Sequence, residues 1–392
     1  MLFRRSLLPL TLSLLCGLPL AAQQSLVYIG TYTVRAGGAT KDPTSKGIYV
    51  SKFDLASGKM EPIELAAEIT NPSFFAIHPN GKFLYAVGET YGSAGKPGGM
   101  VTAFSIDAST GKLTKLNEVG SEGGGPCFAT VDKTGRWVLI ANYGTGSVAS
   151  FALATDGKLG AAASVMQHKG SSVNAQRQKG PHAHSINIDP KNRFAVAADL
   201  GTDRLYIYKF DQKTGKLSEH SEFQMKPGAG PRHFSFHPSG KYAFAINEMH
   251  LTVTSMFWDG NAGKLVEIET LPTIPGEVQA GQSTAEVLAH PSGKFVYGSN
   301  RGHDTIAVFS IDNRGKLARV GNQPTQGKTP RNFGLSPDGK WLIAANQNSD
   351  SLVVFKIDQA TGVLTPTGQQ LEAPMPVCVR FLVQPKGGLF GK

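Results

Sequence analysis

Two histidines stand two residues apart in the stretch KGPHAHS, at the start of a segment that reads as a β-strand. Successive side chains of a strand point to opposite faces, so His182 and His184 share one face. Two imidazoles on one face can bind a metal, perform acid–base chemistry, or hydrogen-bond within ordinary packing. No third ligand follows at a spacing typical of zinc, so we expect no metal and no cofactor. Which of these roles applies depends on where the shared face points. That direction depends on the strands that carry the histidines.

A turn followed by a strand recurs six times along the chain, as in HPNGKFLYAVGE (78–89) and HPSGKYAFAINE (237–248). A second signal, a strand that ends in a turn like Gly-Lys-Leu, recurs seven times, with last residues that run from Met60 to Leu364. The average step of about 51 residues suits one four-stranded propeller blade. The sequence therefore predicts an all-β, seven-bladed β-propeller with antiparallel blades. A β-sandwich is the alternative, and seven equal repeats argue against it.

The first signal is one repeat short because the chain enters a blade midway. Residues 26–33 supply the second strand of that blade, and residues 375–383 supply its innermost strand. The two ends of the chain are thus expected to close the ring without a covalent link. No helical period interrupts the repeats, so residues 23–392 are expected to form a single domain.

Equivalent positions of a propeller form rings around its axis. Positions five residues before each turn and eleven residues after its first residue should meet at one mouth. In four consecutive blades these positions carry His184, Arg232, Glu248, Arg301 and Arg331. A ring that served packing alone would repeat similar residues, whereas these rings are irregular and charged. A bound anion would satisfy the arginines, and a mutually satisfied Arg–Glu plug is the alternative.

The first 22 residues have the pattern of a secretory signal peptide. Arg4 and Arg5 precede an apolar run, and Ala22 ends a small-residue cleavage site. Lipidation at Cys16 fits less well, and no later segment is apolar enough to span a bilayer. We therefore expect a periplasmic or secreted protein without stable membrane insertion.

The net charge, the two cysteines beyond the first 22 residues and the closed fold each lead to a further expectation. The formal net charge is +10, but no run of basic residues concentrates it, so we expect no nucleic-acid partner and a mild attraction for small anions. Cys127 and Cys378 lie far apart in the sequence and are expected to be buried and inert. A monomer is expected, because a closed propeller exposes only short edges.

Several motifs together are specific to one family: NAQRQKGPHAHS (174–185), GAGPRHFSFHPSGK (228–241), INE (246–248) and SNRGHDTIAVF (299–309). On these motifs the chain resembles the seven-bladed propeller lactonases. That family includes bacterial 6-phosphogluconolactonases and a fungal carboxy-muconate lactonizing enzyme. The resemblance covers essentially the whole chain after the signal peptide.

The resemblance implies a lactone-processing site with four catalytic residues, His184, Arg232, Glu248 and Arg301. His184 is the favoured base, with Glu248 as the alternative base, arginine-orienting group or proton relay. The arginines would hold the oxyanion or an anionic group of the substrate. Further substrate contacts are expected from His182, Arg331, Arg177, Gln178, Glu286 and His303. Glu286 and His303 occupy family motifs near the mouth, where capping of strand ends is favoured over substrate contact, and for His182 a structural role is favoured over support of His184.

The leading function is hydrolysis of an anionic lactone by an exported enzyme. A sugar-phosphate lactone arises in the cytoplasm, so export favours a non-phosphorylated sugar-acid lactone or another anionic lactone. A muconate-type cycloisomerase and a non-enzymatic binding propeller are the two alternatives.

Overall fold

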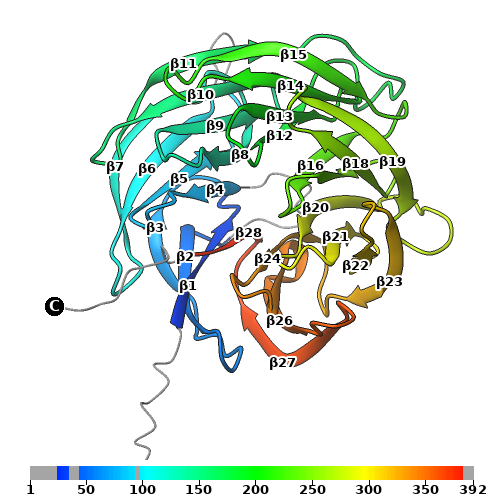
Figure 1. The fold of residues 1–392 in the computed structure, drawn as a ribbon. Coiled ribbons are helices and arrows are strands. Elements are labelled where there is room, and N and C mark those ends of the chain that lie inside the picture. Colours follow the sequence, from blue (N-terminus) through cyan, green and yellow to red (C-terminus); the bar gives the residue numbers. More distant parts are fainter. Residues whose placement is uncertain (1–23, 35–43, 93–97, 383–392) are drawn as a thin grey trace, which may run out of the picture.

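The computed structural model describes residues 24–34, 44–92 and 98–382. These residues form seven four-stranded antiparallel sheets, which follow one another around a ring (Figure 1). The predicted seven-bladed β-propeller is thereby confirmed. The predicted signal peptide lies outside the described residues.

Each blade runs from an innermost strand to an outermost strand, and six blades follow the chain order. The first three of these consist of β4 (Phe74–Ile77), β5 (Phe83–Gly88), β6 (Met100–Ile106) and β7 (Leu113–Gly120); β8 (Pro126–Val131), β9 (Trp137–Asn142), β10 (Ser147–Leu153) and β11 (Leu159–Gln167); and β12 (Ala183–Ile188), β13 (Phe194–Asp199), β14 (Arg204–Phe210) and β15 (Leu217–Gln224). The next three consist of β16 (Pro231–Phe236), β17 (Tyr242–Asn247), β18 (Thr252–Asp259) and β19 (Lys264–Pro272); β20 (Ser283–Ala289), β21 (Phe295–Arg301), β22 (Thr305–Ile311) and β23 (Leu317–Pro324); and β24 (Pro330–Leu335), β25 (Trp341–Asn346), β26 (Ser351–Ile357) and β27 (Leu364–Glu372). A short 3-10 helix, η1 (Gln347–Ser349), joins β25 to β26.

The seventh blade joins the two ends of the chain. Its strands are β28 (Pro376–Phe381), β1 (Gln24–Thr31), β2 (Gly47–Asp54) and β3 (Glu64–Glu68), in that order outward. In Figure 1 the red β28 lies against the blue β1, and the two strands pair antiparallel with Val27 opposite Phe381. The expected non-covalent closure of the ring is confirmed.

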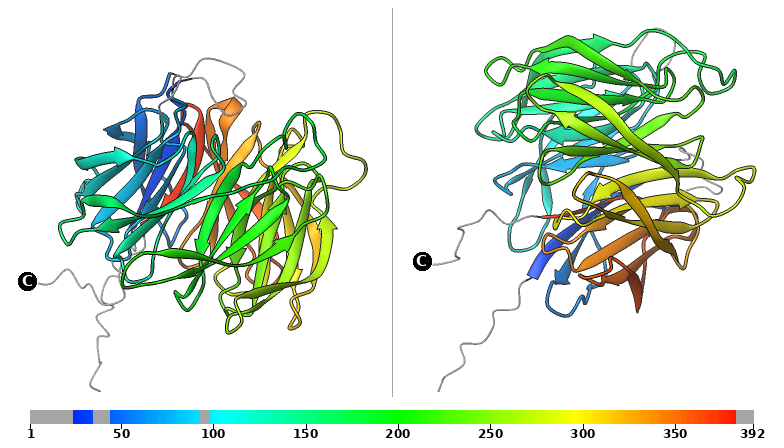
Figure 2. Two further views of the ribbon diagram at one scale, coloured as in Figure 1. Left: turned by 90° about the horizontal axis from the view of Figure 1, so that it is seen from above. Right: turned by 45° about the vertical axis from the view of Figure 1, so that its right-hand side comes forward.

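The burial pattern of the strands follows from their place in the blade. The second strands, such as β9 and β25, are buried along their whole length because neighbouring blades cover both faces. The outermost strand β11 alternates between exposed and partly buried residues, as expected for a strand with one face in water. The two views of Figure 2 show the sheets stacked face to face around the ring.

The histidines of the HPxG turns tie adjacent blades together. Nε2 of His237 lies 2.7 Å from the carbonyl oxygen of Gly293, the turn glycine of the next blade. Gly293 has a φ of 73°, and a Cβ there would lie 2.7 Å from the ring of His237, so the contact requires glycine. His290 makes the same contact with Gly339, also at 2.7 Å. These turns fix the end of the propeller opposite the predicted mouth.

Among the described residues, no helix has the length and apolar character that crossing a membrane requires. Cys127 and Cys378 are buried and free, as expected.

Candidate active site

A cavity of about 290 Å³ lies where the first strands of the blades begin and the second strands end. It is lined by Glu89, Tyr91, Cys127, Tyr143, Arg177, His184, Glu248, Ser283, Arg301 and Arg331. All of these except Tyr91, Arg177 and Ser283 come from the two irregular rings that the sequence repeat defines. Equivalent positions of neighbouring blades therefore form most of the cavity wall.

Glu248 is the centre of the charged side of this cavity. Its carboxylate accepts a hydrogen bond from Nη2 of Arg177 at 2.9 Å. It also forms ion pairs with Nε of Arg232 and Nη2 of Arg301, both at 2.9 Å. The three guanidinium groups come from the loop before β12, from β16 in the blade of Glu248, and from β21 in the following blade. One carboxylate thus holds together three segments that are distant in the sequence.

Burial and charge oppose each other at Glu248. Burial disfavours its ionised form, but the charges of Arg301, Arg232 and Arg177 outweigh burial and hold the pKa of this carboxyl well below its usual range. Glu248 is therefore ionised and fully engaged by cations. Such a carboxylate is a weak base and a strong orienting group.

Arg232 lies behind the cavity wall and does not line the cavity. It is buried, and its Nη1 donates to the carbonyl oxygen of Ala285 at 2.8 Å. Burial, together with the charges of Arg331 and Arg301, lowers the pKa of Arg232 to about 10, so the side chain stays charged at neutral pH. Arg232 thus affects the cavity through its ion pair with Glu248, whereas Arg301 lines the cavity itself.

Arg301 is partly exposed to the cavity and has a buried donor that no protein group satisfies. Its Nη2 donates to the carbonyl oxygen of Thr284 at 2.7 Å in addition to the ion pair with Glu248. Its Nε is buried and makes no hydrogen bond with the protein. An oxygen of a ligand or a water molecule can satisfy such a donor.

His184 is the second residue of β12 and lines the cavity. It is buried, with Nδ1 3.5 Å from Sγ of Cys127. Burial and the nearby charge of Arg232 lower the pKa of His184 well below its usual value. His184 is therefore neutral at physiological pH, which is the form that accepts a proton.

Tyr143 connects the two histidines of KGPHAHS. Its ring stacks on His182, with centroids 4.5 Å apart, and meets the edge of His184 at 5.3 Å. Nδ1 of His182 contacts the carbonyl oxygen of Tyr143 at 2.9 Å. The phenol oxygen of Tyr143 accepts a hydrogen bond from Arg177 at 3.0 Å. His182 lies outside the cavity wall and supports it through Tyr143.

The far side of the cavity carries a second acidic group. Glu89 is buried and accepts a hydrogen bond from the hydroxyl of Tyr32 at 3.0 Å. The guanidinium of Arg331 lies over the ring of Tyr32, 5.5 Å from its centroid. Counted by formal charge, the arginines at 177, 232, 301 and 331 outnumber Glu89 and Glu248 by two. This excess of positive charge suits an anionic ligand.

Besides His182, three more of the expected substrate contacts lie outside the cavity wall. Gln178 is buried in its loop, where Nε2 donates to the carbonyl oxygen of Leu200 at 2.8 Å. His303 caps the turn before β22 through a 2.8 Å contact between Nδ1 and the hydroxyl of Thr305. Glu286 lies deeper along β20 than the mouth expected for it and lines a different cavity in the central channel. The spacing within β20 explains the difference, since Ser283 at its start reaches the mouth while Glu286 is three residues further in.

Tyr143 and Glu89 were not singled out as site residues, although both occupy the ring eleven residues after the first turn residue. Their blades lack the charged neighbours that drew attention to Glu248 and Arg301. Tyr91 comes from a glycine-rich loop and has no signal in the repeat. Among the described residues, no group of three His, Cys, Asp or Glu side chains is arranged to hold a metal ion.

Comparison with known proteins agrees with this geometry. The family described as "Lactonase, 7-bladed beta-propeller" matches residues 26–381. A 6-phosphogluconolactonase of Bacillus subtilis (strain 168) is 37% identical over 358 residues, covering 91% of this chain and 98% of the relative. A 6-phosphogluconolactonase of Formosa agariphila is 33% identical over 316 residues, covering 79% and 86%.

A solved structure of similar shape is the periplasmic gluconolactonase of Pseudomonas aeruginosa. It superposes with a TM-score of 0.84 at 30% identity and covers 92% of this chain and 100% of that chain. The resemblance inferred from the motifs is thereby confirmed. The chain belongs to the seven-bladed β-propeller lactonase family.

Proposed function

We propose that the chain is a lactone hydrolase that opens an anionic lactone in the cavity between His184 and Arg301. The observation that carries the proposal is the pairing of a neutral, buried imidazole with an arginine cluster around one cavity. Family membership supports the reaction class, since the similar proteins bear the names 6-phosphogluconolactonase and gluconolactonase.

The chemistry needs a base, an oxyanion site and a proton for the leaving group. Neutral His184 takes a proton from water while the water oxygen attacks the carbonyl carbon of the lactone. Arg301 faces the cavity and stabilises the negative charge that develops on the carbonyl oxygen. The ring C–O bond then breaks, and His184 returns its proton to the departing alkoxide. The product is a hydroxy acid, which ionises at neutral pH.

Glu248 acts as the orienting group in this scheme. Three guanidinium groups engage both oxygens of its carboxylate, two of them on Oε2 and one on Oε1. The ionised carboxylate thus fixes the position of Arg301 and Arg177 at the cavity wall. We therefore propose the orienting role for Glu248 and the role of base for His184, whose neutral ring lines the cavity.

The proposed substrate class follows from the charge of the site and from the proposed export. The excess positive charge favours a lactone that carries a carboxylate or phosphate group. Arg177 is half exposed at the rim and is placed to meet such a group as it enters. We further propose that the chain is exported through the signal peptide read in residues 1–22, which favours a non-phosphorylated sugar-acid lactone.

A panel of lactones tests the proposal, with acid release followed in a pH-stat. The panel should pair anionic lactones with neutral analogues and include muconates. Acid release that is faster for anionic lactones and lost in both His184→Ala and Arg232→Ala supports hydrolysis. Turnover of muconates without lactone opening supports the lyase alternative, and inactivity on the whole panel contradicts the proposal.

A further inference from the structure

A second histidine, His233, lies directly behind the arginine cluster. It follows Arg232 in β16 and is buried, with 3% of its surface exposed. Nε2 of His233 lies 3.3 Å from Nη1 of Arg232, and its Nδ1 lies 2.8 Å from Oε1 of Glu286. These contacts link Glu286, His233, Arg232 and Glu248 in one chain of polar groups.

The chemistry of its neighbours fixes the protonation state of His233. A guanidinium has only donors, so Nε2 of His233 must accept from Arg232. An ionised carboxylate has only acceptors, so Nδ1 must donate to Glu286. Only a neutral imidazole with its proton on Nδ1 meets both conditions. Burial is the main reason why the pKa of His233 falls to about 4, which agrees with a neutral ring.

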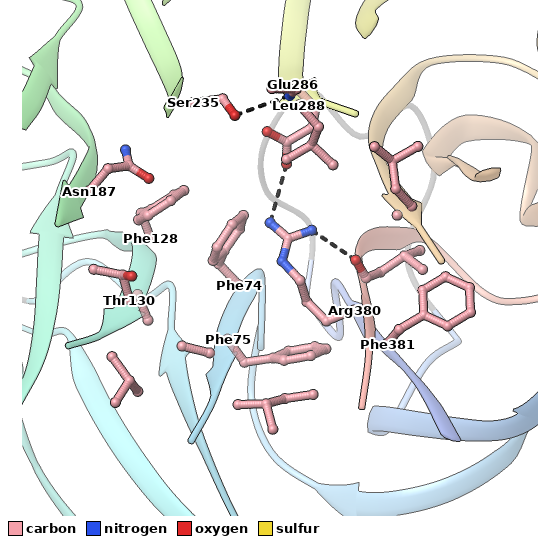
Figure 3. A pocket seen from close by; sticks show the side chains of 18 of the residues that line it. Phe74, Phe75, Phe128, Thr130, Asn187, Ser235, Glu286, Leu288, Arg380 and Phe381 are labelled. Atoms are coloured by element: carbon pink, nitrogen blue, oxygen red, sulfur yellow. Dashed lines mark hydrogen bonds and ion pairs between the residues drawn. The ribbon is translucent and has the colours of Figure 1, made fainter. Parts of the chain in front are cut away.

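Glu286 is anchored firmly enough to hold this tautomer. Its Oε1 also accepts from the backbone N–H of Val287 at 3.0 Å. Its Oε2 accepts from the amide of Asn332 and forms an ion pair with Arg380 at 3.3 Å. Figure 3 shows Glu286 and Arg380 joined in the central channel, among Phe74, Phe75 and Phe128. The carboxylate therefore belongs to the channel, yet it acts on the wall of the active site through His233.

The ring of His233 is also confined by its neighbours. It meets Phe128 edge to face at 5.2 Å and Phe74 at 5.6 Å. Its other neighbour is the ring of His184, 5.3 Å away between centroids. His233 thus lies between the channel and both parts of the candidate site.

We propose that His233, held in its Nδ1–H tautomer by Glu286, is a positioning residue that fixes Arg232 and through it the Glu248–Arg301 pair. This inference rests on the proposed lactone hydrolysis for its kinetic consequence. An unprotonated Nε2 accepts from Nη1 of Arg232, the nitrogen that also donates to the carbonyl oxygen of Ala285, while Nε of Arg232 pairs with Glu248. If the acceptor is lost, Arg232 can turn and Glu248 loses one of its three fixed partners.

The kinetic test compares two substitutions of His233. His233→Phe keeps an aromatic ring against Phe74 and Phe128 but offers Arg232 no acceptor. His233→Gln keeps an amide oxygen that can accept from Arg232. We expect His233→Phe to lower kcat/KM for the best lactone by ten- to about a hundredfold, the loss typical of a misplaced reacting group. His233→Gln should recover a large part of that loss.

The matched control is His290→Gln. His290 is as deeply buried, but its Nε2 contacts the carbonyl oxygen of Gly339 in a turn at the far end of the blade. This variant should lower the melting temperature and leave kcat/KM unchanged. A folded His233→Phe variant with wild-type kcat/KM would overturn the inference.

A second measurement keeps the inference separate from the proposed function. NMR of ¹⁵N-histidine-labelled wild-type protein at pH 7 should show His233 as a neutral ring protonated on Nδ1. An Nε2–H tautomer or an imidazolium at His233 would overturn the inference whether or not the protein opens lactones. This measurement uses the wild-type protein alone. Inactivity of the wild type on all lactones, with the Nδ1–H signal present, would contradict the proposed function and leave the positioning of Arg232 supported.

Discussion

Nη2 of Arg301 lies 2.9 Å from Oε2 of Glu248, although the two residues belong to neighbouring blades. Glu248 directly follows β17, and Arg301 is the last residue of β21. Each is therefore carried by the rigid end of a buried second strand rather than by a long loop. The site is a product of how the blades are packed, and its geometry depends on the closed ring.

Replacing the central carboxylate should damage both stability and activity. Glu248→Gln leaves three guanidinium groups without their shared counter-ion, and breaking a buried ion pair in this way costs about 3–5 kcal/mol. Urea unfolding at pH 7 measures the loss. Glu118→Gln is the control, because Glu118 pairs with Lys115 on the surface and such pairs contribute less than about 1 kcal/mol. Equal stability of the two variants would contradict the central role of Glu248.

Substitutions of Arg301 and Arg177, two of the three arginines that line the cavity, should have different kinetic effects. Arg301→Lys keeps the charge but loses the fixed fork of donors, and we expect kcat to fall about 10²–10³-fold as for the loss of an oxyanion donor. Arg177→Ala removes a half-exposed rim contact and should mainly raise KM. Steady-state kinetics on one anionic lactone measures both. If Arg177→Ala lowers kcat as much as Arg301→Lys does, the assignment of Arg301 to the oxyanion and of Arg177 to substrate binding is contradicted.

Substitutions of Tyr143 test whether its ring positions His184, and we expect smaller effects from them than from the arginine substitutions. Tyr143→Phe removes the hydroxyl that accepts from Arg177 but keeps the ring against His182 and His184. A lost hydrogen bond to a charged group costs about 1.5–3 kcal/mol at most, so we expect a rise in KM of about tenfold and little change in kcat. Tyr143→Ala also removes the ring and should lower kcat. If both variants behave alike, the ring does not position His184.

The repeat made most of the fold and much of the site predictable. Turn and strand signals recur at equal steps, and equivalent positions of a closed ring must face one another. His184, Glu248, Arg301 and Arg331 were thus placed at one cavity from spacing alone. The turn-and-strand signal occurs six times and the Gly-Lys-Leu-like signal seven times, and this difference predicted that residues 26–33 and 375–383 share one blade and close the ring.

The depth of each side chain was not predictable in this way. Arg232 shares its ring with His184, yet its long side chain runs behind the wall, because Glu248 and the carbonyl oxygen of Ala285 attract it there. Glu286 lies in a family motif beside the mouth, but its carboxylate turns into the channel toward His233 and Arg380. Such choices depend on contacts between blades, which a period along one chain does not encode.

The buried histidines predict that stability falls in acid. Burial lowers the pKa of His233 to about 4 and that of His184 also falls, whereas an unfolded histidine takes up a proton near pH 6.5. Between these values the unfolded state binds more protons, so the free energy of unfolding decreases as the pH drops from about 6.5 toward 4, by roughly 3 kcal/mol for His233 alone.

Glu286 extends the decrease to lower pH. Burial opposes its ionisation, but His233 and Arg380 outweigh burial and lower its pKa to about 2. Its contribution to stability is present above the unfolded value near 4.5 and is lost as the pH falls toward 2. Urea unfolding measured at half-unit steps from pH 7.5 to pH 2 checks both windows. A free energy of unfolding that stays constant from pH 7 to pH 4.5 would contradict the neutral, buried state of these histidines.

The most direct measurement is acid release from an anionic lactone by the wild type and by His184→Ala, with and without added imidazole. With His184 as the base, the substitution should lower kcat/KM by about 10²–10⁴-fold without unfolding the protein, and imidazole should restore part of the rate. A folded His184→Ala variant that opens the lactone as fast as the wild type would contradict the account.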